Sequence, residues 1–215
     1  MAVPNAVRAY FHVEENWDRT LPVHIPLVSI NEEPLWLEHP VHGKIVDIAA
    51  LPLPKTPGLS VFPISWRNPI PLARRIGIPA KVVGFPFGYR INKNFPVWLT
   101  GALASEPDVD VDGLPLMLVD CRTRRGNSGS PVLLHYPQGT MYAHEDGSAS
   151  TSSRDVIRYL GIYSGRISVG SDIGRVWKIS AVIDVLNEYE KTKGSTTCSL
   201  ALGADTAYGA SPAAA

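Results

Sequence analysis

Residues 126–131 read Gly126-Asn127-Ser128-Gly129-Ser130-Pro131, and this hexapeptide places a hydroxyl on a tight turn between two glycines. Gly126 allows the backbone to approach a ligand closely, and Gly129 allows backbone conformations that residues with a Cβ avoid. In such a turn the amides of Gly126 and Ser128 can point the same way, toward the space that the Ser128 hydroxyl would attack. Two converging amides are what acyl transfer through a tetrahedral oxyanion requires. The stretch therefore predicts a serine nucleophile at position 128.

Composition sets limits on the class of protein. The chain has 215 residues, enough for one large or two small domains, and its 20 Lys and Arg residues balance 20 Asp and Glu residues. A net charge of zero predicts neither a nucleic-acid partner nor an acidic membrane partner. No signal peptide or membrane-length apolar run is visible, which predicts a cytoplasmic location. Cys121 and Cys198 allow one disulfide but no disulfide framework.

Short apolar runs bounded by proline and glycine predict β-strands at 8–13, 61–64, 81–85, 115–119, 131–134 and 159–165. Strands of this length in series favour an antiparallel barrel or sandwich over alternating strands and helices. One helix is expected late, capped by Ser180, with apolar positions at helical spacing up to Tyr189.

The segments between these runs suggest a division of the chain. Residues 138–154 are polar and predict a long surface loop, and the Pro/Arg-rich stretch 68–78 predicts a link between two halves. We therefore expect a first β domain over 1–75 and a second over 76–192. Residues 193–215 are rich in Ser, Thr, Ala and Gly and predict a disordered tail.

Several motifs in order resemble the trypsin-like (chymotrypsin-fold) serine peptidases, in particular their bacterial, disulfide-poor branch. The hexapeptide 126–131 matches the family's nucleophile motif, and Asp47-Ile48-Ala49-Ala50-Leu51 is similar to its aspartate segment. Gly84-Phe85-Pro86 resembles a turn of the second barrel, and Gly161-Ile162-Tyr163-Ser164-Gly165 resembles the strand that lines the substrate cleft. The resemblance spans roughly residues 40–189. It implies an all-β fold of two antiparallel barrels, with the N-terminal barrel incomplete and a short C-terminal helix.

The resemblance also implies roles for single residues. Ser128 would be the nucleophile, Asp47 the carboxylate that orients a histidine, and Gly126 and Ser128 the donors of oxyanion amides. The substrate side chain and backbone would be bound by Arg122, Thr123, Tyr163, Ser164 and Gly165. The implied reaction is hydrolysis of peptide bonds in a peptide or protein substrate through an acyl-enzyme, without cofactor or metal. Asp47 opens an apolar run, so we expect its carboxylate to be buried and partnered.

The family's histidine is missing from its usual place, because no apolar-Thr/Asn-x-x-His segment precedes Asp47. His12 lies at about the right distance but within an apparent strand, and His39 and His42 fit a surface turn. Two explanations stay open: an upstream segment with the histidine precedes this start, or the chain is a degenerate homologue. Without its base a triad loses several orders of magnitude in rate.

Three other functions compete with peptide hydrolysis. A non-catalytic module could bind an extended peptide along 160–165 by strand addition. His39 and His42 near Asp47 could bind a metal ion, although zinc sites need three or four ligands. Arg122, Arg124 and Arg125 are a small basic cluster that could face nucleic acid, but a role as pocket lining or solvated surface fits a neutral protein better.

Overall fold

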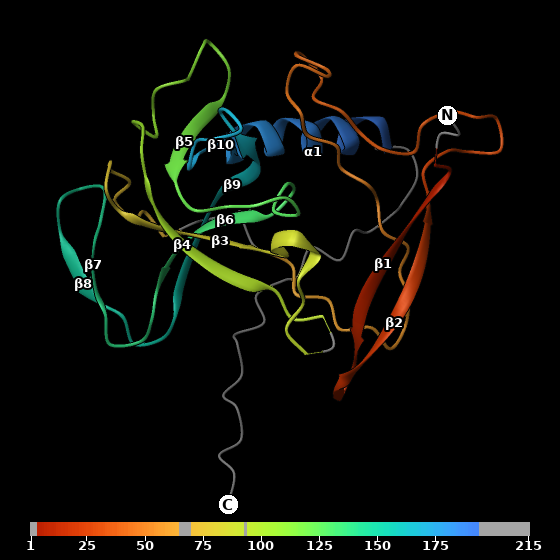
Figure 1. Ribbon diagram of the computed structural model, residues 1–215, viewed down its shortest axis with the longest axis horizontal. Coiled ribbons are helices and arrows are strands. Elements are labelled where there is room, and N and C mark those ends of the chain that lie inside the picture. Colours follow the sequence, from red (N-terminus) through yellow and green to blue (C-terminus); the bar gives the residue numbers. More distant parts are fainter. Residues whose placement is uncertain (1–3, 65–69, 93, 194–215) are drawn as a thin grey trace, which may run out of the picture.

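The computed structural model describes residues 4–64, 70–92 and 94–193, and its centre is a closed antiparallel barrel of six strands (Figure 1). Around the barrel the strand order is β10-β5-β4-β3-β6-β9. The strands are β3 (Pro79–Gly84), β4 (Val97–Leu103), β5 (Leu116–Asp120), β6 (Pro131–Tyr136), β9 (Val156–Arg166) and β10 (Ile173–Lys178). A closed barrel leaves no unpaired sheet edge along its paired length.

Alternating burial along the strands builds the barrel core. In β3 the side chains of Ala80 and Val82 point inward and are 1% exposed, while their neighbours are exposed or half-buried. The other strands add Leu103, Val119, Val132, Leu134, Leu160, Tyr163 and Val176 to the same cluster. The predicted runs at 81–85, 115–119, 131–134 and 159–165 thus supply inward-facing side chains of the barrel.

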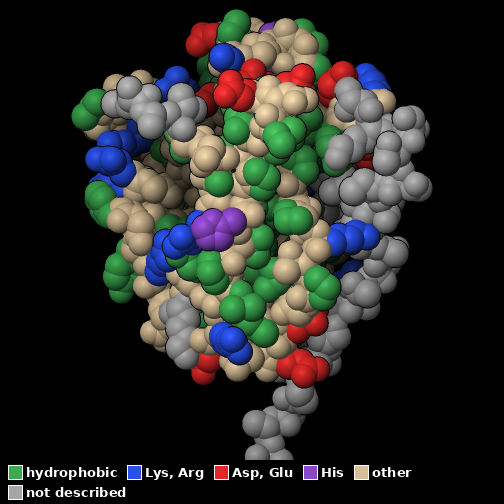
Figure 2. Space-filling model, turned by 90° about the vertical axis from the view of Figure 1, so that its right-hand side faces the viewer, with side chains coloured by type: hydrophobic (Ala, Val, Ile, Leu, Met, Phe, Trp, Pro, Cys, Tyr) green, Lys and Arg blue, Asp and Glu red, His purple; other side chains and the backbone are tan. Residues whose placement is uncertain are grey.

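Two hairpins lie outside the barrel. β1 (Ala6–Val13) pairs with β2 (Asn16–Pro26) in a two-stranded sheet, and this hairpin stands beside the barrel in Figure 1. β7 (Met141–Ala143) pairs with β8 (Ala149–Thr151), and a single 3-10 turn, η1 (Pro86–Gly88), follows β3. The face shown in Figure 2 carries many hydrophobic side chains, and the hairpin β1–β2 exposes Val7, Tyr10 and Leu21 to solvent.

A second apolar cluster packs the N-terminal segment onto the barrel and the helix. α1 (Ile179–Lys193) buries Ala181, Val185 and Tyr189 along one face. Ala181 and Val185 join a cluster that consists of Val46, Ile48, Leu116 and Trp177, with Leu37, Ala50 and Ile162 at its edge. Segment 37–50 has no regular strand, but this burial holds it against the outer side of the barrel.

The all-β class with a C-terminal helix is confirmed, and several local predictions are wrong. Residues 61–64 form no strand, and 138–154 contain the hairpin β7–β8 instead of an irregular loop. Within 70–78, Leu72 is fully buried in the barrel core, and the role of this stretch as a link between two halves stays a prediction. Ser180 lies inside α1, which begins at Ile179.

Other expectations stay open. The N-terminal part contributes one two-stranded hairpin, and the division at residue 75 stays a prediction. The predicted tail, 193–215, lies outside the described residues after Lys193, as does Cys198. Cys121 is a free, buried thiol. Within the described part of the chain, no helix is long and apolar enough to cross a membrane.

Candidate functional site

The turn around Ser128 is held by its own backbone and by Asn127. The Asn127 amide donates to the Arg124 carbonyl at 3.1 Å, and the Ser130 amide donates to the Asn127 carbonyl at 3.0 Å. The Asn127 side chain is fully buried, and its Oδ1 accepts the Arg124 amide at 3.0 Å. Gly126 and Gly129 adopt φ of 94° and 85°, the left-handed region that the motif predicted.

Neighbouring elements fix this turn on two sides. On the β9 side, the Gly129 amide donates to the Tyr163 carbonyl at 2.8 Å, and the Tyr163 amide donates to the Ser130 carbonyl at 2.9 Å. On the η1 side, the Phe87 amide donates to the Arg125 carbonyl at 2.5 Å. The backbone of Gly126 is so close to Phe85 that a Cβ would lie 2.2 Å from the Phe85 carbonyl oxygen. The turn 126–130 is therefore held by β9 on one side and by η1 on the other.

The amides of Gly126 and Ser128, the two predicted oxyanion donors, stay available to a ligand. Both residues are exposed, and neither amide donates a hydrogen bond to any of the described residues. Every other amide from Asn127 to Ser130 has a backbone acceptor. An amide that the fold leaves unpaired at an exposed turn can bind an anionic oxygen.

Ser164 joins the predicted nucleophile to the predicted carboxylate. The Ser128 hydroxyl donates to the Ser164 carbonyl at 2.9 Å, and the Ser164 hydroxyl donates to Asp47 Oδ2 at 3.1 Å. These three residues are separated by 36 and 117 positions along the chain. The tertiary structure thus brings together three residues that the sequence had singled out, and Ser164 adds a link that sequence reasoning had not assigned to it.

Asp47 is placed by its two neighbours. Val46 and Ile48 are buried against Trp177 and α1, so the backbone between them is fixed and the Asp47 side chain points outward. Asp47 itself is exposed, in an irregular segment, which corrects the expectation of a buried carboxylate. Side chains in this run alternate between the two sides of the backbone, so Val46 and Ile48 are buried and the carboxylate between them lies at the surface.

No histidine takes the place between Asp47 and Ser128. Within the described residues, which include all six histidines, neither Ser128 nor Asp47 forms a hydrogen bond with an imidazole. The His12 ring stacks on Phe95 with a centroid distance of 4.7 Å. His135 pairs with Asp155 at 3.1 Å, and His144 bonds to Ser150 at 2.8 Å.

His39 corrects the expectation of a surface residue, because it is only 4% exposed. Its Nδ1 accepts the amides of Val41 and His42, both at 3.2 Å, which closes the turn 39–43. Its Nε2 lies 3.5 Å from the Asp184 carboxylate of α1. His39 therefore helps to dock segment 37–50. No group of three or more possible metal ligands occurs in the part of the chain that the structure describes.

The predicted substrate residues divide into buried and accessible ones. Thr123 is fully buried and Tyr163 is 2% exposed, and their two hydroxyls form a short hydrogen bond. Burial raises the pKa of the Tyr163 phenol, although its bond to Thr123 opposes the shift. Ser164 and Gly165 are half-buried and Arg122 is exposed. Any contact of Thr123 or Tyr163 with a substrate backbone would come from main-chain atoms.

The end of β9 offers a free edge beside Ser128. Residues up to Ile162 pair with β6, whereas Gly165 and Arg166 pair only with β10. Within the described structure, β6 therefore does not pair with Ser164–Arg166, and the Ser164 carbonyl accepts the Ser128 hydroxyl. An unpaired strand edge can accept an extended peptide.

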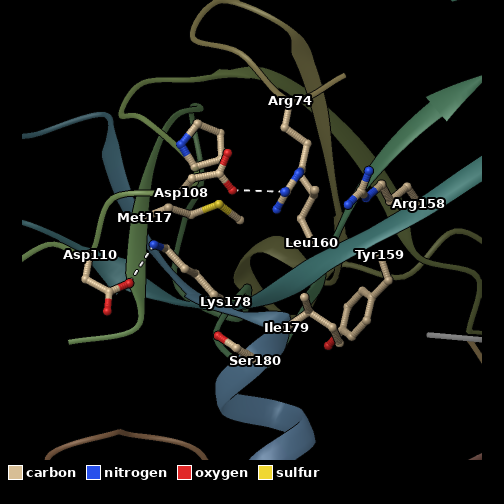
Figure 3. A pocket seen from close by; sticks show the side chains of 11 residues that line it. Arg74, Asp108, Asp110, Met117, Arg158, Tyr159, Leu160, Lys178, Ile179 and Ser180 are labelled. Carbon is tan, nitrogen blue, oxygen red and sulfur yellow. Dashed lines mark hydrogen bonds and ion pairs between the residues drawn. The ribbon is translucent and has the colours of Figure 1, made fainter. Parts of the chain in front are cut away.

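A separate cavity lies between β9, β10 and the β4–β5 connection (Figure 3). It measures about 280 Å³ and is lined by side chains that include Arg74, Arg158 and Lys178. Each cation is paired: Arg74 with Asp108 at 2.9 Å, Lys178 with Asp110 at 2.7 Å and Arg158 with Glu145 at 2.8 Å. These pairs tie loops to the barrel, and none of the residues around Ser128 lines this cavity.

Comparison with known proteins identifies no family. No protein-family model and no curated protein matches the chain. A solved structure to which it is similar is that of Rv3671c from M. tuberculosis H37Rv, a serine-to-alanine mutant in an inactive form, with 16% identity and a TM-score of 0.40. The match covers 64% of this chain and 58% of that chain, so it spans less than two thirds of the other protein.

Proposed function

We propose that this chain carries a serine peptidase centre in which Ser128 attacks the carbonyl carbon of a peptide bond. The observation that carries the proposal is the hydrogen-bonded series Ser128–Ser164–Asp47, with bonds of 2.9 and 3.1 Å, beside two unpaired amides. A nucleophile, a carboxylate and oxyanion donors then lie at one place, next to a free strand edge. Peptide or protein substrates are the expected partners.

The reaction needs a base that takes the Ser128 proton. As Ser128 Oγ bonds to the substrate carbon, an imidazole would accept the hydroxyl proton, and the carbonyl oxygen would become an oxyanion bound by the amides of Gly126 and Ser128. Collapse would expel the amine, which takes that proton, and leave an acyl ester on Ser128. Water would then cleave the ester, with the same imidazole accepting and returning a proton.

Asp47 is suited to orient such an imidazole. Only its Oδ2 is bonded in the described structure, to Ser164, so Oδ1 can accept an imidazole N–H. In the observed state the Ser128 hydroxyl is bonded to a carbonyl, which orients it but removes no proton. We therefore infer that the chain as described attacks slowly, and that an added imidazole speeds the attack.

Labelling with a fluorophosphonate probe, with and without free imidazole, tests this proposal by intact-mass analysis. We expect one adduct, absent in Ser128→Ala, whose rate of formation rises at least about tenfold with imidazole because a general base is restored. We expect free imidazole to accelerate labelling less in Asp47→Asn and in Ser164→Ala. Ser168→Ala, at an exposed serine in the connection that follows β9, is the matched control and should retain the acceleration by imidazole.

Non-catalytic peptide binding is the second candidate, favoured by the Ser128 hydroxyl being bonded to a backbone carbonyl and by the free edge at Ser164–Arg166. A strand-adding peptide needs main-chain partners and no nucleophile. Absence of any adduct, even with imidazole, together with peptide binding that persists in Ser128→Ala, would select this candidate and reject the peptidase proposal.

A further inference from the structure

The Tyr163 ring occupies the space behind the nucleophile turn. Its backbone is bonded to Gly129 and Ser130, so the side chain starts directly beside Ser128. Its hydroxyl reaches Thr123, in the loop that precedes the nucleophile turn. The ring therefore spans the distance between strand β9 and that loop.

β10 closes the third side of the same space. A Cβ placed on Gly174 would lie 2.3 Å from Cε2 of Tyr163 and 3.1 Å from its hydroxyl oxygen. The ring is thus packed directly on the Gly174 backbone, where any larger residue would displace it. With 2% of its surface exposed, Tyr163 leaves little open volume between the loop, β9 and β10.

A substrate that lies along Ser164–Arg166 with its carbonyl at Ser128 would direct one side chain into this region. The loop 122–125 and strand β9 are its two walls, and the hydroxyl pair Tyr163–Thr123 bridges them. A bulky side chain would have to break this buried hydrogen bond and displace a ring packed in the core.

We propose that Tyr163 fills the side-chain pocket beside Ser128 and restricts the residue bound there to Gly, Ala or Ser. The proposal rests on the proposed function for the location of the substrate, and it names the class of substrate: chains with a small residue at the site of attack. Thr123 lies on the opposite wall, where its hydroxyl is bonded to that of Tyr163.

Two matched peptides test the proposal, identical except for Ala or Phe at the carboxyl-terminal residue. Binding to the Ser128→Ala protein is measured by fluorescence anisotropy, and labelling of the unaltered protein is measured with the corresponding Ala and Phe peptide phosphonates. We expect the Ala member to be favoured at least about tenfold in both measurements, as a closed pocket discriminates by size. Equal or tighter binding of the Phe peptide would overturn the proposal, as would binding of neither peptide.

Variants at Tyr163 test whether its ring causes the preference for the Ala peptide. Tyr163→Val should reduce the preference for Ala at least about tenfold, because removing the ring opens room for Phe. Tyr163→Phe is the matched control: it keeps the ring, loses the bond to Thr123 and should retain the preference. If Tyr163→Val does not fold, the ratio of binding and labelling between the Ala and Phe peptides, measured on the unaltered protein and on Tyr163→Phe, still tests the proposal.

The outcomes separate this proposal from the peptidase proposal. No fluorophosphonate adduct, together with a strong preference for the Ala peptide in binding, would reject the chemistry and support the pocket assignment. An adduct that forms equally fast with Ala and Phe phosphonates would support the chemistry and reject the pocket assignment.

Discussion

Gly126 has the tightest surroundings in the nucleophile turn. Its φ of 94° disfavours residues with a Cβ, and the added Cβ would meet the Phe85 carbonyl oxygen at 2.2 Å. Gly129 in the same turn has a similar φ of 85°, but a Cβ there would meet no atom within 4 Å. Comparing alanine variants at the two glycines therefore distinguishes the cost of backbone strain from the cost of steric contact with Phe85.

Replacing these glycines with alanine tests how firmly η1 supports the turn. We expect Gly129→Ala to cost about 1 kcal/mol of unfolding free energy from strain alone. Gly126→Ala should cost about 2 kcal/mol more, because the turn must also move away from Phe85. Urea unfolding measures both values. Equal costs for the two variants would mean that the contact with Phe85 is weak.

At the scale of elements, an ion-pair network ties the β7–β8 hairpin to the barrel. Glu145, between β7 and β8, bonds to Arg158 of β9 at 2.8 Å and to Arg74 at 3.2 Å. Desolvation alone would raise the pKa of Glu145, but the hydrogen bonds and charges of Arg158 and Arg74 outweigh it and hold that pKa below its usual 4.5. The ionised form is therefore favoured by folding.

A pH titration of stability tests this pair. Because the folded pKa lies below the unfolded one, Glu145 stabilises the fold fully above pH 4.5, and this contribution is lost as the pH falls through the folded pKa. Glu145→Gln should lower the unfolding free energy near neutral pH and converge with the unaltered protein in acid. The exposed Glu106→Gln is the control and should run parallel to the unaltered protein throughout.

At the scale of the whole molecule, the hairpin β1–β2 lies outside the barrel, and none of its described side chains belongs to either apolar core cluster. Its strands pair with each other, and most β1 side chains are exposed or half-buried. Its links to other segments include the bridge from Val13 to Leu59 and a hydrogen bond from Asn94 to Thr20 at 3.0 Å. The barrel, by contrast, is closed around one core.

Hydrogen exchange should reveal this difference. We expect the amides of β1 and β2 to exchange at least about tenfold faster than those of β3, β6 and β9, because the hairpin can open without disrupting the barrel core. Mass spectrometry of the two sets of peptides measures the rates. Equal protection would show that the hairpin unfolds only together with the barrel.

The sequence by itself determined four of the six barrel strands (β3, β5, β6 and β9), the helix and the turn at Ser128, whereas β4 and β10 were not predicted. Alternation and short apolar runs are local signals, and the two glycines of the motif indicate backbone angles without reference to the rest of the chain. Residues 61–64 show the limit of such signals, because an apolar run becomes a strand only where a partner strand is available.

Only the tertiary structure decided what surrounds that turn. Asp47 is exposed although its run is apolar, because burial of Val46 and Ile48 against α1 turns the carboxylate outward. The Ser164 hydroxyl reaches Asp47 across 117 positions, and the Tyr163 ring fills a space whose third wall is Gly174. No local pattern encodes which side chain occupies a space between three distant segments, since packing is settled by all of them together.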